Sequence, residues 1–501
     1  MVLMLDIHTR RGLQDENKKT FEAVDHRGEH GPFQPDTRDW GRPRRTRTPQ
    51  RKAALLHAVV DDPSVSTRQV ATTILFWLGA LCTSLLGTYY LLFASWNAYQ
   101  YNAVSFTMDT TYLTWNTSFP AVSVCEIDFR EMSDKVFSYA DEKFGKSRDM
   151  SIVGCLRDVA YFTGKCFSCP SCNRSYFHPS EFTRIVEEIR APCSELLANC
   201  VWNGQPFDCC SNFLPLQTEW GVCYVINSLQ TRKYNSLDHR KPELISNFST
   251  GPGKLEFEAN ENIMISFHSP EDVPYSGMAR AQYEDLMLGQ DFAMIFQVKE
   301  IMNDPALRAV SVAQRGCVFP DEISLVSYPY YSYSACLLQC RAEAQIKLCN
   351  CTHHFMPLRY NDTTCSIDGL MCFSRNLDEL NGLKVQGSLK PGLFCDCKPS
   401  CTEPEYNVVW KSTDRSEDYD EFVYTSEEEE EEEEEYDKTE NTFTTKVSLQ
   451  LNALPTVRFK RNVVRTVLDL VVSMGGTAGL FLGASLLSLV ELVMFICIRR
   501  W

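Results

Sequence analysis

The residues best suited to chemistry lie in one apolar segment near the end of the chain. Between Thr466 and Ile498 a stretch rich in Leu and Val is interrupted by small and acidic residues, namely Gly475, Gly476, Gly479, Gly483, Ser485 and Glu491. Glycines allow helices to approach closely or to unwind locally, and irregular backbone at membrane depth survives only inside protein or beside water. The glycines alone would also suit helix dimerisation through small residues.

Glu491 argues against simple packing, because a carboxylate inside a membrane is costly unless it faces a cavity. A ring of backbone carbonyls and hydroxyls can replace part of the hydration shell of an ion. Glu491 follows Ser485 by six residues, which places it ~9 Å deeper in a regular helix, where a ring of carboxylates would favour cations. The segment therefore predicts a cation pathway.

A second apolar segment lies early in the chain and predicts the membrane topology. Val70–Ala94 contains 25 residues without a charge, enough to span a ~30 Å hydrocarbon core with some tilt. Met1–Leu5 is too short an apolar run for a secretory signal. Seven Lys or Arg residues lie in Arg42–Arg68, and the first charge after the segment is Asp109, so the positive-inside rule places the N-terminus in the cytoplasm.

The two segments divide the chain into five regions. We expect a cytoplasmic tail over 1–69, a first transmembrane helix over 70–94, an extracellular domain over 95–465, a transmembrane pore helix over 466–498 and a cytoplasmic end over 499–501. Four basic residues lie on the extracellular side of the second span, against the charge rule, but long translocated domains largely escape that rule. The predicted location is the plasma membrane.

Cysteines and glycosylation acceptors support the extracellular assignment. Of 22 cysteines, 20 lie between Cys125 and Cys401, a density typical of an oxidising compartment. The disulfide candidates are Cys125, Cys200, Cys209, Cys210, Cys223, Cys317, Cys336, Cys340, Cys349, Cys351, Cys365, Cys372, Cys395, Cys397 and Cys401; their pairing cannot be deduced from one sequence. Acceptor sequons occur at Asn116, Asn173, Asn247, Asn350 and Asn361.

Cys166, Cys169 and Cys172 have spacing that also occurs in zinc sites, but zinc normally needs two pairs across a longer loop. His353 and His354 are candidate ligands without a third or fourth partner at tetrahedral spacing, so we interpret them as structural or exposed. No set of residues suggests catalysis. We expect no enzyme activity, no metal and no cofactor.

The formal charge of −16 is concentrated in one place. Residues 417–440 carry 15 acids, including the run Glu427–Glu435, against Lys438, and the rest of the chain is about −2. Nothing favours nucleic acid binding. Blocks of like charge repel and stay unfolded, so we interpret 416–440 as a solvated acidic insertion, with a cation-concentrating loop as the alternative.

Within the extracellular domain, alternating patterns predict strands at Phe119–Cys125, Met264–His268, Tyr406–Trp410 and Thr444–Leu451. Helical spacing predicts helices at Ser180–Cys200 and Ser332–Leu348, and the second places Cys336 and Cys340 on one face. The fold class is therefore an α+β membrane protein with two transmembrane helices and a large disulfide-rich extracellular domain.

Several motifs in order resemble the degenerin/epithelial sodium channel superfamily over roughly residues 55–498. The glycine-rich segment from Gly475 to Glu491 resembles its pore helix. The ectodomain resembles it at Phe119–Cys125, Cys209-Cys210, Thr218–Asn227, Gln314–Cys317, Cys336–Cys340, Cys349–Cys351 and Cys395–Cys401, and His268–Pro274 is similar to the insect pickpocket branch.

The resemblance implies a sodium-preferring, amiloride-sensitive homo- or heterotrimer with a hand-like ectodomain, in which a β-rich palm carries a helical finger and thumb. It implies a selectivity filter at Gly483, Ala484 and Ser485, a blocker contact at Gly479 and a gate at Val472. Two departures concern gating: His57 is followed by Ala58 where the family has glycine, and Val472 stands where the family has a small residue.

Three other classes remain as alternatives. An ATP-gated trimeric receptor would lack the glycine-rich pore motif, and an ectoenzyme would need a nucleophile, base or metal set. An auxiliary, non-conducting two-span subunit would keep the ectodomain and lose the pore. Force, protons, peptides and small odorants or pheromones are all compatible as the stimulus.

Overall fold

The computed structural model describes a large part of the chain, namely residues 67–111, 114–128, 134–145, 149–231, 244–357, 364–384, 387–402, 404–415, 444–483 and 486–498. Contacts divide the chain into two units, Met1–Gly79 and Ala80–Trp501. The gating candidates His57 and Ala58, the sequon at Asn361 and the acidic insertion lie outside the described residues.

One helix, α2 (Thr67–Tyr101), contains the first predicted span and extends beyond both of its predicted ends. In the described part of the chain it is the one helix long and apolar enough to cross a membrane, over Ala71–Tyr101. Its side chains are largely exposed, including Trp77 and Tyr90. A helix that is apolar and uncovered is suited to lipid.

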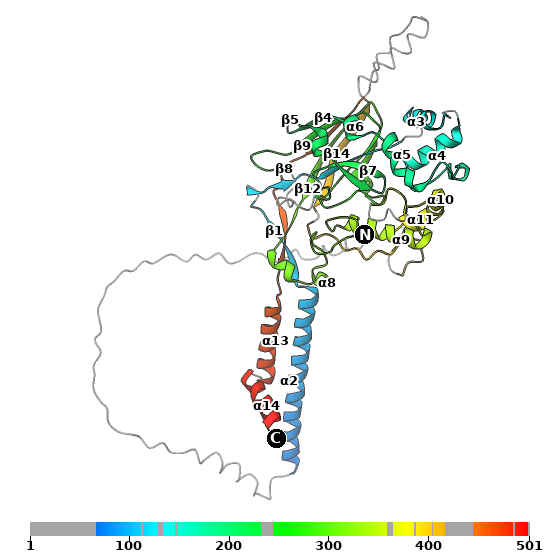
Figure 1. The fold of residues 1–501 in the computed structure, drawn as a ribbon. Helices are drawn as coiled ribbons and strands as arrows, with labels where there is room; N and C mark the ends of the chain where they lie inside the picture. Colours follow the sequence, from blue (N-terminus) through cyan, green and yellow to red (C-terminus); the bar gives the residue numbers. More distant parts are fainter. Residues whose placement is uncertain are drawn as a thin grey trace, which may run out of the picture. The chain divides into compact units, whose positions relative to one another are not determined.

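Two sheets form the centre of the unit Ala80–Trp501 (Figure 1). The first has the order β14-β12-β15-β9-β4-β5, with β14 Glu405–Arg415, β12 Gln290–Lys299, β15 Thr445–Leu451, β9 Lys254–Ala259, β4 Leu197–Trp202 and β5 Gln205–Pro206. The second has the order β11-β10-β3-β7-β6, with β11 Tyr283–Leu286, β10 Ile263–His268, β3 Ala121–Glu126, β7 Gly221–Ile226 and β6 Leu214–Thr218. Their shared core includes Phe119, Phe257 and Phe296.

A third sheet connects this domain to the apolar helices. Its order is β1-β16-β13, with β1 Val104–Asp109, β16 Arg458–Val463 and β13 Ile301–Asn303. Strand β1 follows α2 directly, and β16 precedes α13 (Val467–Leu482), so the antiparallel pair holds the ends of both helices together. A two-stranded sheet pairs β2 Thr117–Ser118 with β8 Ile245–Ser246.

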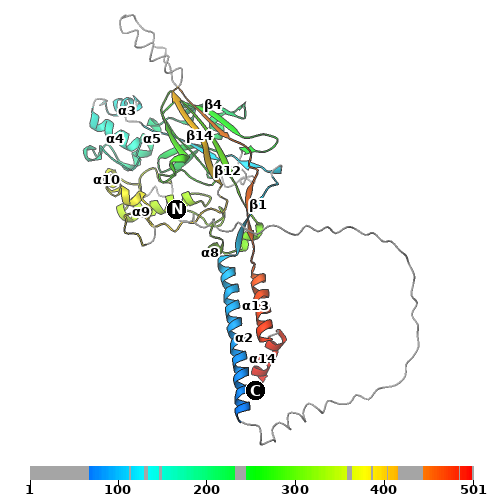
Figure 2. The same cartoon turned by 180° about the vertical axis from the view of Figure 1, so that it is seen from behind.

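Most ectodomain helices form two groups (Figure 2). One contains α3 Asp134–Phe144, α4 Met150–Ala160 and α5 Phe182–Ile189; the other contains α9 Tyr333–Cys349, α10 Ile367–Arg375 and α11 Leu377–Asn381. Short helical turns are η2 Cys169–Ser171, η3 Pro179–Glu181, α6 Cys193–Leu196, α7 Cys209–Asn212, η4 Arg280–Gln282, η5 Pro305–Ala309 and α8 Val312–Arg315. The mixture of β-sheets and peripheral helices confirms the α+β prediction.

Ten disulfides cross-link this domain, and every cysteine predicted as a candidate is paired. The bonds are 125–223, 155–172, 166–169, 193–210, 200–209, 317–401, 336–397, 340–395, 349–372 and 351–365. Cys336 and Cys340 lie four apart on α9 and reach Cys397 and Cys395 on one neighbouring segment. The zinc alternative for Cys166, Cys169 and Cys172 is wrong, because their sulfurs are bonded to other cysteines.

The predicted strands are confirmed within a few residues as β3, β10, β14 and β15, and the helix predicted at Ser332–Leu348 is confirmed as α9. The helix predicted over Ser180–Cys200 is wrong. Helix α5 ends at Ile189, and the chain re-forms as the short α6 and then strand β4 from Leu197. Pro192 explains the break, because a residue preceding proline is pushed out of the helical region.

Candidate ion pathway and its junction with the ectodomain

The second apolar segment is divided into two helices. Helix α13 begins with Thr466 as N-cap in a capping box with Asp469 and ends at Leu482. Gly483 takes the left-handed conformation with φ 62° and donates its N–H to Gly479 O at 3.1 Å. A second helix, α14 Leu486–Ile498, follows. A helix end with left-handed glycine is a favoured C-terminal arrangement, so Gly483 is the place where helical backbone stops.

The break lies at the predicted filter, but the filter roles themselves remain predictions. Ala484 and Ser485 lie outside the described residues. Val472 and Gly479 are exposed on α13, and Glu491 is exposed on α14. Thus every described residue predicted to act in the pore lies on the surface of this single chain. Each of them is accessible to a neighbouring subunit or to water.

Two polar contacts hold α13 against the part of α2 that follows Ala80. The Oγ atoms of Ser95 and Ser473 are 2.9 Å apart, near the ectodomain end of both helices. Close to the break, Ser84 Oγ donates to the Phe481 carbonyl. Gly87 faces the Phe481 ring at short range. The helix pair is therefore fixed at two levels, one of them one turn or less from Gly483.

At the ectodomain end of α2, the short helix α8 contacts it. Gln314 Nε2 donates to the Tyr99 carbonyl at 3.2 Å, and the Val464 N–H donates to the Ala103 carbonyl at 2.8 Å. The first bond joins the ectodomain to the last turn of α2, and the second joins the entry to α13 to the residue before β1. The ectodomain is therefore bonded directly to the last turn of α2.

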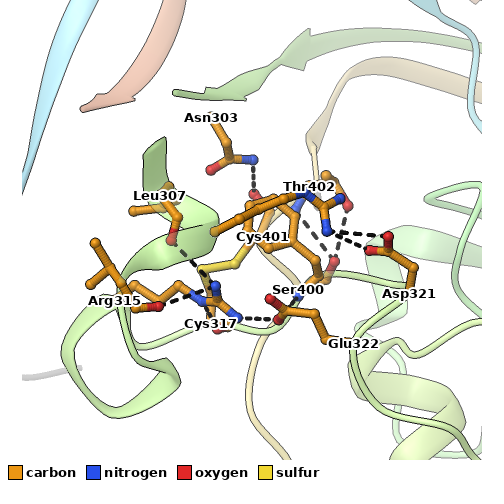
Figure 3. A network of polar contacts seen from close by, with 12 residues as sticks. Asn303, Leu307, Arg315, Cys317, Asp321, Glu322, Ser400, Cys401 and Thr402 are labelled. Carbon is orange, nitrogen blue, oxygen red and sulfur yellow. Dashed lines mark hydrogen bonds and ion pairs between the residues drawn. A yellow bond between two sulfur atoms is a disulfide. The ribbon is translucent and has the colours of Figure 1, made fainter. Parts of the chain in front are cut away.

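Next to Gln314, a buried arginine organises the junction (Figure 3). The Arg315 side chain is 1% exposed and forms an ion pair with Glu322. It also donates to Cys317 O at 2.9 Å and to Leu307 O and Val310 O at 3.3 Å. A planar guanidinium suits this work, because its donors point in fixed directions. Arg315 thus ties η5 and α8 to the segment that carries Cys317.

The Cys317–Cys401 disulfide connects the segment after α8 to the segment before β14. Asn303 Nδ2, from β13, donates to Cys401 O at 2.9 Å (Figure 3). Arg461, from β16, places Nη1 2.6 Å from Cys317 Sγ, and burial lowers its pKa. Because β16 leads into α13, these contacts connect the disulfide-linked ectodomain to the second apolar segment. In the sequence, Gln314–Cys317 was noted only as part of a family motif, and no role was predicted for these residues.

A buried acidic cluster lies beside the junction. Glu271 accepts hydrogen bonds from Thr402 Oγ1 at 2.9 Å and from Ser269 Oγ at 3.2 Å, and Asp272 accepts one from Ser334 Oγ at 2.7 Å. Burial raises the pKa of the Glu271 carboxyl to about 7. Glu271 also lines a cavity of about 440 Å³ that reaches Asn303 and Asp321. This carboxyl therefore changes charge near neutral pH.

A larger cavity of about 600 Å³ is lined by α4 and by the strands β3, β10 and β11. Its walls include Phe167, Trp220 and Tyr283. Glu126, which also lines this cavity, accepts hydrogen bonds from Tyr161 Oη at 2.8 Å and from the Ala191 N–H at 2.7 Å. Burial raises the pKa of the Glu126 carboxyl. The size and the aromatic walls suit a small ligand.

The remaining predicted residues have mainly structural surroundings. His353 and His354 are packed among Phe162, Phe355 and other rings, and burial lowers their pKa values to about 3 and about 4. His353 is buried and His354 is half-buried, so the structural alternative holds and the exposed one does not. Of the described sequon residues, Asn116, Asn173 and Asn350 are exposed and Asn247 is half-buried; their glycosylation remains a prediction.

Comparison with known proteins identifies the family. The family described as amiloride-sensitive sodium channel matches residues 62–495, almost the whole chain. The chain belongs to this family. Membership of the amiloride-sensitive sodium channel family makes it a membrane protein of that channel family. The resemblance drawn from the pore and cysteine motifs is thereby confirmed.

Individual relatives are distant. The chain is similar to the sodium channel protein Nach of Drosophila ananassae, at 22% identity over 62% of this chain and 58% of the relative. It is similar to pickpocket protein 19 of Drosophila melanogaster, at 24% identity over 64% of both chains. It is also similar to mouse acid-sensing ion channel 4, at 26% identity over 85% of this chain and 74% of the relative. The match thus spans just over half of the first relative and about three quarters of the last.

Proposed function

We propose that this chain is a pore-forming subunit of a trimeric, amiloride-sensitive, sodium-selective channel of the plasma membrane, with both termini in the cytoplasm. The observation that carries the proposal is the end of α13 at Gly483, within the Gly-Ala-Ser sequence. Non-helical backbone at membrane depth is tolerated where it lines water. Carbonyls released from helical hydrogen bonding there can coordinate a partly dehydrated ion.

The predicted roles follow from this position. Gly483, Ala484 and Ser485 form the filter, Gly479 one turn earlier contacts the blocker, and Val472 guards the gate. Glu491 supplies a ring of carboxylates on the cytoplasmic side, which favours cations. His57 and Ala58 belong to the gating apparatus of the N-terminal tail.

Assembly is supported by empty space around two glycines. A Cβ on Gly475 or Gly476 would meet no heavy atom within 4 Å in the described part of this chain. Their small size is therefore not used inside one subunit, whereas a helix from another subunit could approach there closely. Homotrimers and heterotrimers with related subunits both satisfy this requirement.

Gating through the ectodomain is supported by the junction at Arg315 and Gln314. Its hydrogen bonds join the disulfide-linked domain to α2 and, through Arg461, to the strand that leads into α13. A displacement of the ectodomain would therefore move both helices together. The stimulus is left unassigned.

The test is the selectivity of variants at Ser485. The chain is expressed alone and with a related subunit, and reversal potentials are measured with sodium and then potassium outside, with and without amiloride. Ser485→Val and Ser485→Leu are expected to reduce current or raise potassium permeability, because a bulkier ring coordinates sodium poorly. Val490→Leu, an exposed position on α14, is the control for added volume.

Unchanged reversal potentials and amplitudes across the Ser485 variants would remove the filter assignment. A chain that reaches the surface, assembles and leaves the selectivity of its partners unaffected by any Ser485 variant would be an auxiliary subunit instead.

A further inference from the structure

The last turn of α13 is held from outside its own helix. In a regular helix the Phe481 carbonyl would accept from residue 485, but helical backbone stops at Leu482. The last four carbonyls of a helix lack partners within it and need donors from elsewhere. Ser84 of α2 supplies one, because its Oγ donates to the Phe481 carbonyl.

Ser84 makes a second contact within α2 besides the one to Phe481. Its backbone carbonyl is already engaged, since Thr88 Oγ1 donates to Ser84 O at 2.8 Å, and Thr88 is itself 5% exposed. One turn along α2, a Cβ on Gly87 would lie 2.9 Å from a ring carbon of Phe481, closer than real Cβ contacts allow. Gly87 thus lets the Phe481 ring lie against α2 while Ser84 binds the carbonyl of the same residue.

We propose that Ser84 is a positioning residue for the ion filter: by holding the Phe481 carbonyl, it fixes the last turn of α13, which ends at Gly483. The proposal rests on the filter assignment above. Phe481 is two residues from Gly483, so a shift of this turn moves the filter directly.

The second inter-helix contact provides a matched control. Ser95 and Ser473 also join α2 to α13 through a hydrogen bond of 2.9 Å. Ser473 lies ten residues before Gly483, ~15 Å away along a helix. Ser95→Ala therefore weakens the same helix pair by a comparable contact without reaching the filter.

The experiment measures relative potassium and sodium permeability from reversal potentials, normalised to surface protein, in the full-length chain. Ser84→Ala is expected to raise relative potassium permeability about fivefold, the factor that loss of one ordinary hydrogen bond makes in a two-position equilibrium. Ser84→Thr, which keeps the hydroxyl, is expected to restore selectivity. Gly87→Ala, which displaces the Phe481 ring, is expected to act like Ser84→Ala, and Ser95→Ala to leave the ratio unchanged.

A second measurement does not depend on current. In a Cys82→Ser background, which removes the exposed free cysteine of α2, Ser485→Cys is labelled from outside with a membrane-impermeant thiol reagent. Ser84→Ala is expected to change the labelling rate severalfold, and Ser95→Ala to leave it unaltered.

An unchanged permeability ratio and labelling rate in Ser84→Ala would overturn the proposal, as would equal effects of Ser84→Ala and Ser95→Ala. Failure of the filter assignment looks different. In that case bulky substitutions at Ser485 leave selectivity intact, whatever Ser84→Ala does.

Discussion

Arg341 of α9 and Glu219 of the turn between β6 and β7 form a bidentate ion pair in the interior of the ectodomain. Arg341 Nη1 lies 2.9 Å from both Glu219 carboxylate oxygens, and the two side chains are 1% and 8% exposed. Ser276 and the Asn381 carbonyl accept further bonds from the same guanidinium. One arginine therefore fixes α9 to the turn between β6 and β7 and to α11.

Glu219→Gln is expected to lower the free energy of unfolding by about 3 kcal/mol, because it leaves a buried guanidinium without its counter-charge. The check is thermal unfolding of the purified full chain in detergent. Glu405→Gln is the control, since Glu405 pairs with Lys299 at the surface and should cost under ~1 kcal/mol. An equal loss of unfolding free energy in the two variants would show that the buried pair stabilises the fold no more than the surface pair.

At the junction, Arg315→Lys is expected to loosen η5 and α8. Lysine keeps the charge but loses the fork that reaches three carbonyls and Glu322, a loss of about 3 kcal/mol. Hydrogen exchange should rise at Leu307–Cys317 and stay unchanged in α5. Arg308→Lys is a matched control, because Arg308 lies against the same Phe319 ring but pairs with the exposed Asp321. Faster exchange in both variants would contradict the assignment.

Glu271 is expected to make stability depend on pH between 5.5 and 8. Burial raises its pKa to about 7, with Asp272 nearby adding to the shift, against an ordinary value of 4.5. The folded state then holds a proton that the unfolded state releases, so the contribution is complete below pH ~4.5 and is lost as pH rises through 7.

Relative to Glu271→Gln, the wild type is expected to gain about 2 kcal/mol on acidification from pH 8 to pH 5.5. Comparing the two proteins cancels the buried histidines, whose lowered pKa values act in the opposite direction. The measurement is the unfolding midpoint of both proteins at the two pH values. Parallel changes in the two proteins would show that Glu271 is ionised throughout.

Val472→Gly is expected to lower resting sodium current. In the proposed gate, the branched side chain of Val472 keeps neighbouring helices apart, and a bias of ~1.4 kcal/mol changes an open-to-closed ratio tenfold. Ala58→Gly is expected to raise resting current, since glycine reaches backbone conformations closed to alanine. Current is normalised to surface protein in both variants and in the double variant.

Glycine also weakens a helix by ~1 kcal/mol, so Val471→Gly, at the neighbouring exposed position of α13, is the control. A resting current that rises or stays constant in Val472→Gly would refute this account of the gate.

The sequence by itself determined the fold class, the main strands and the helix containing Cys336 and Cys340, and its motifs in order indicated the family. The elements follow from local causes, namely apolar runs, alternation and cysteine density. The end of α13 at Gly483 was not predicted, because a single helix was expected over 466–498. The sequence failed at Ser180–Cys200, where helical spacing continued past Pro192 but the backbone did not. A strong pattern was overruled by one residue that cannot continue a helix.

Tertiary structure alone decided the contacts between distant segments. Disulfide partners such as Cys317 and Cys401 are 84 residues apart, and no spacing reveals which cysteines meet. No local signature predicts the pairs Arg341 and Glu219, Arg315 and Glu322, or Ser84 and Phe481. In a sequence, a charged or hydroxyl side chain cannot be told from an ordinary surface residue, because only the fold decides whether it is buried. Burial converts such residues into specific contacts, since a polar group removed from water must find a partner.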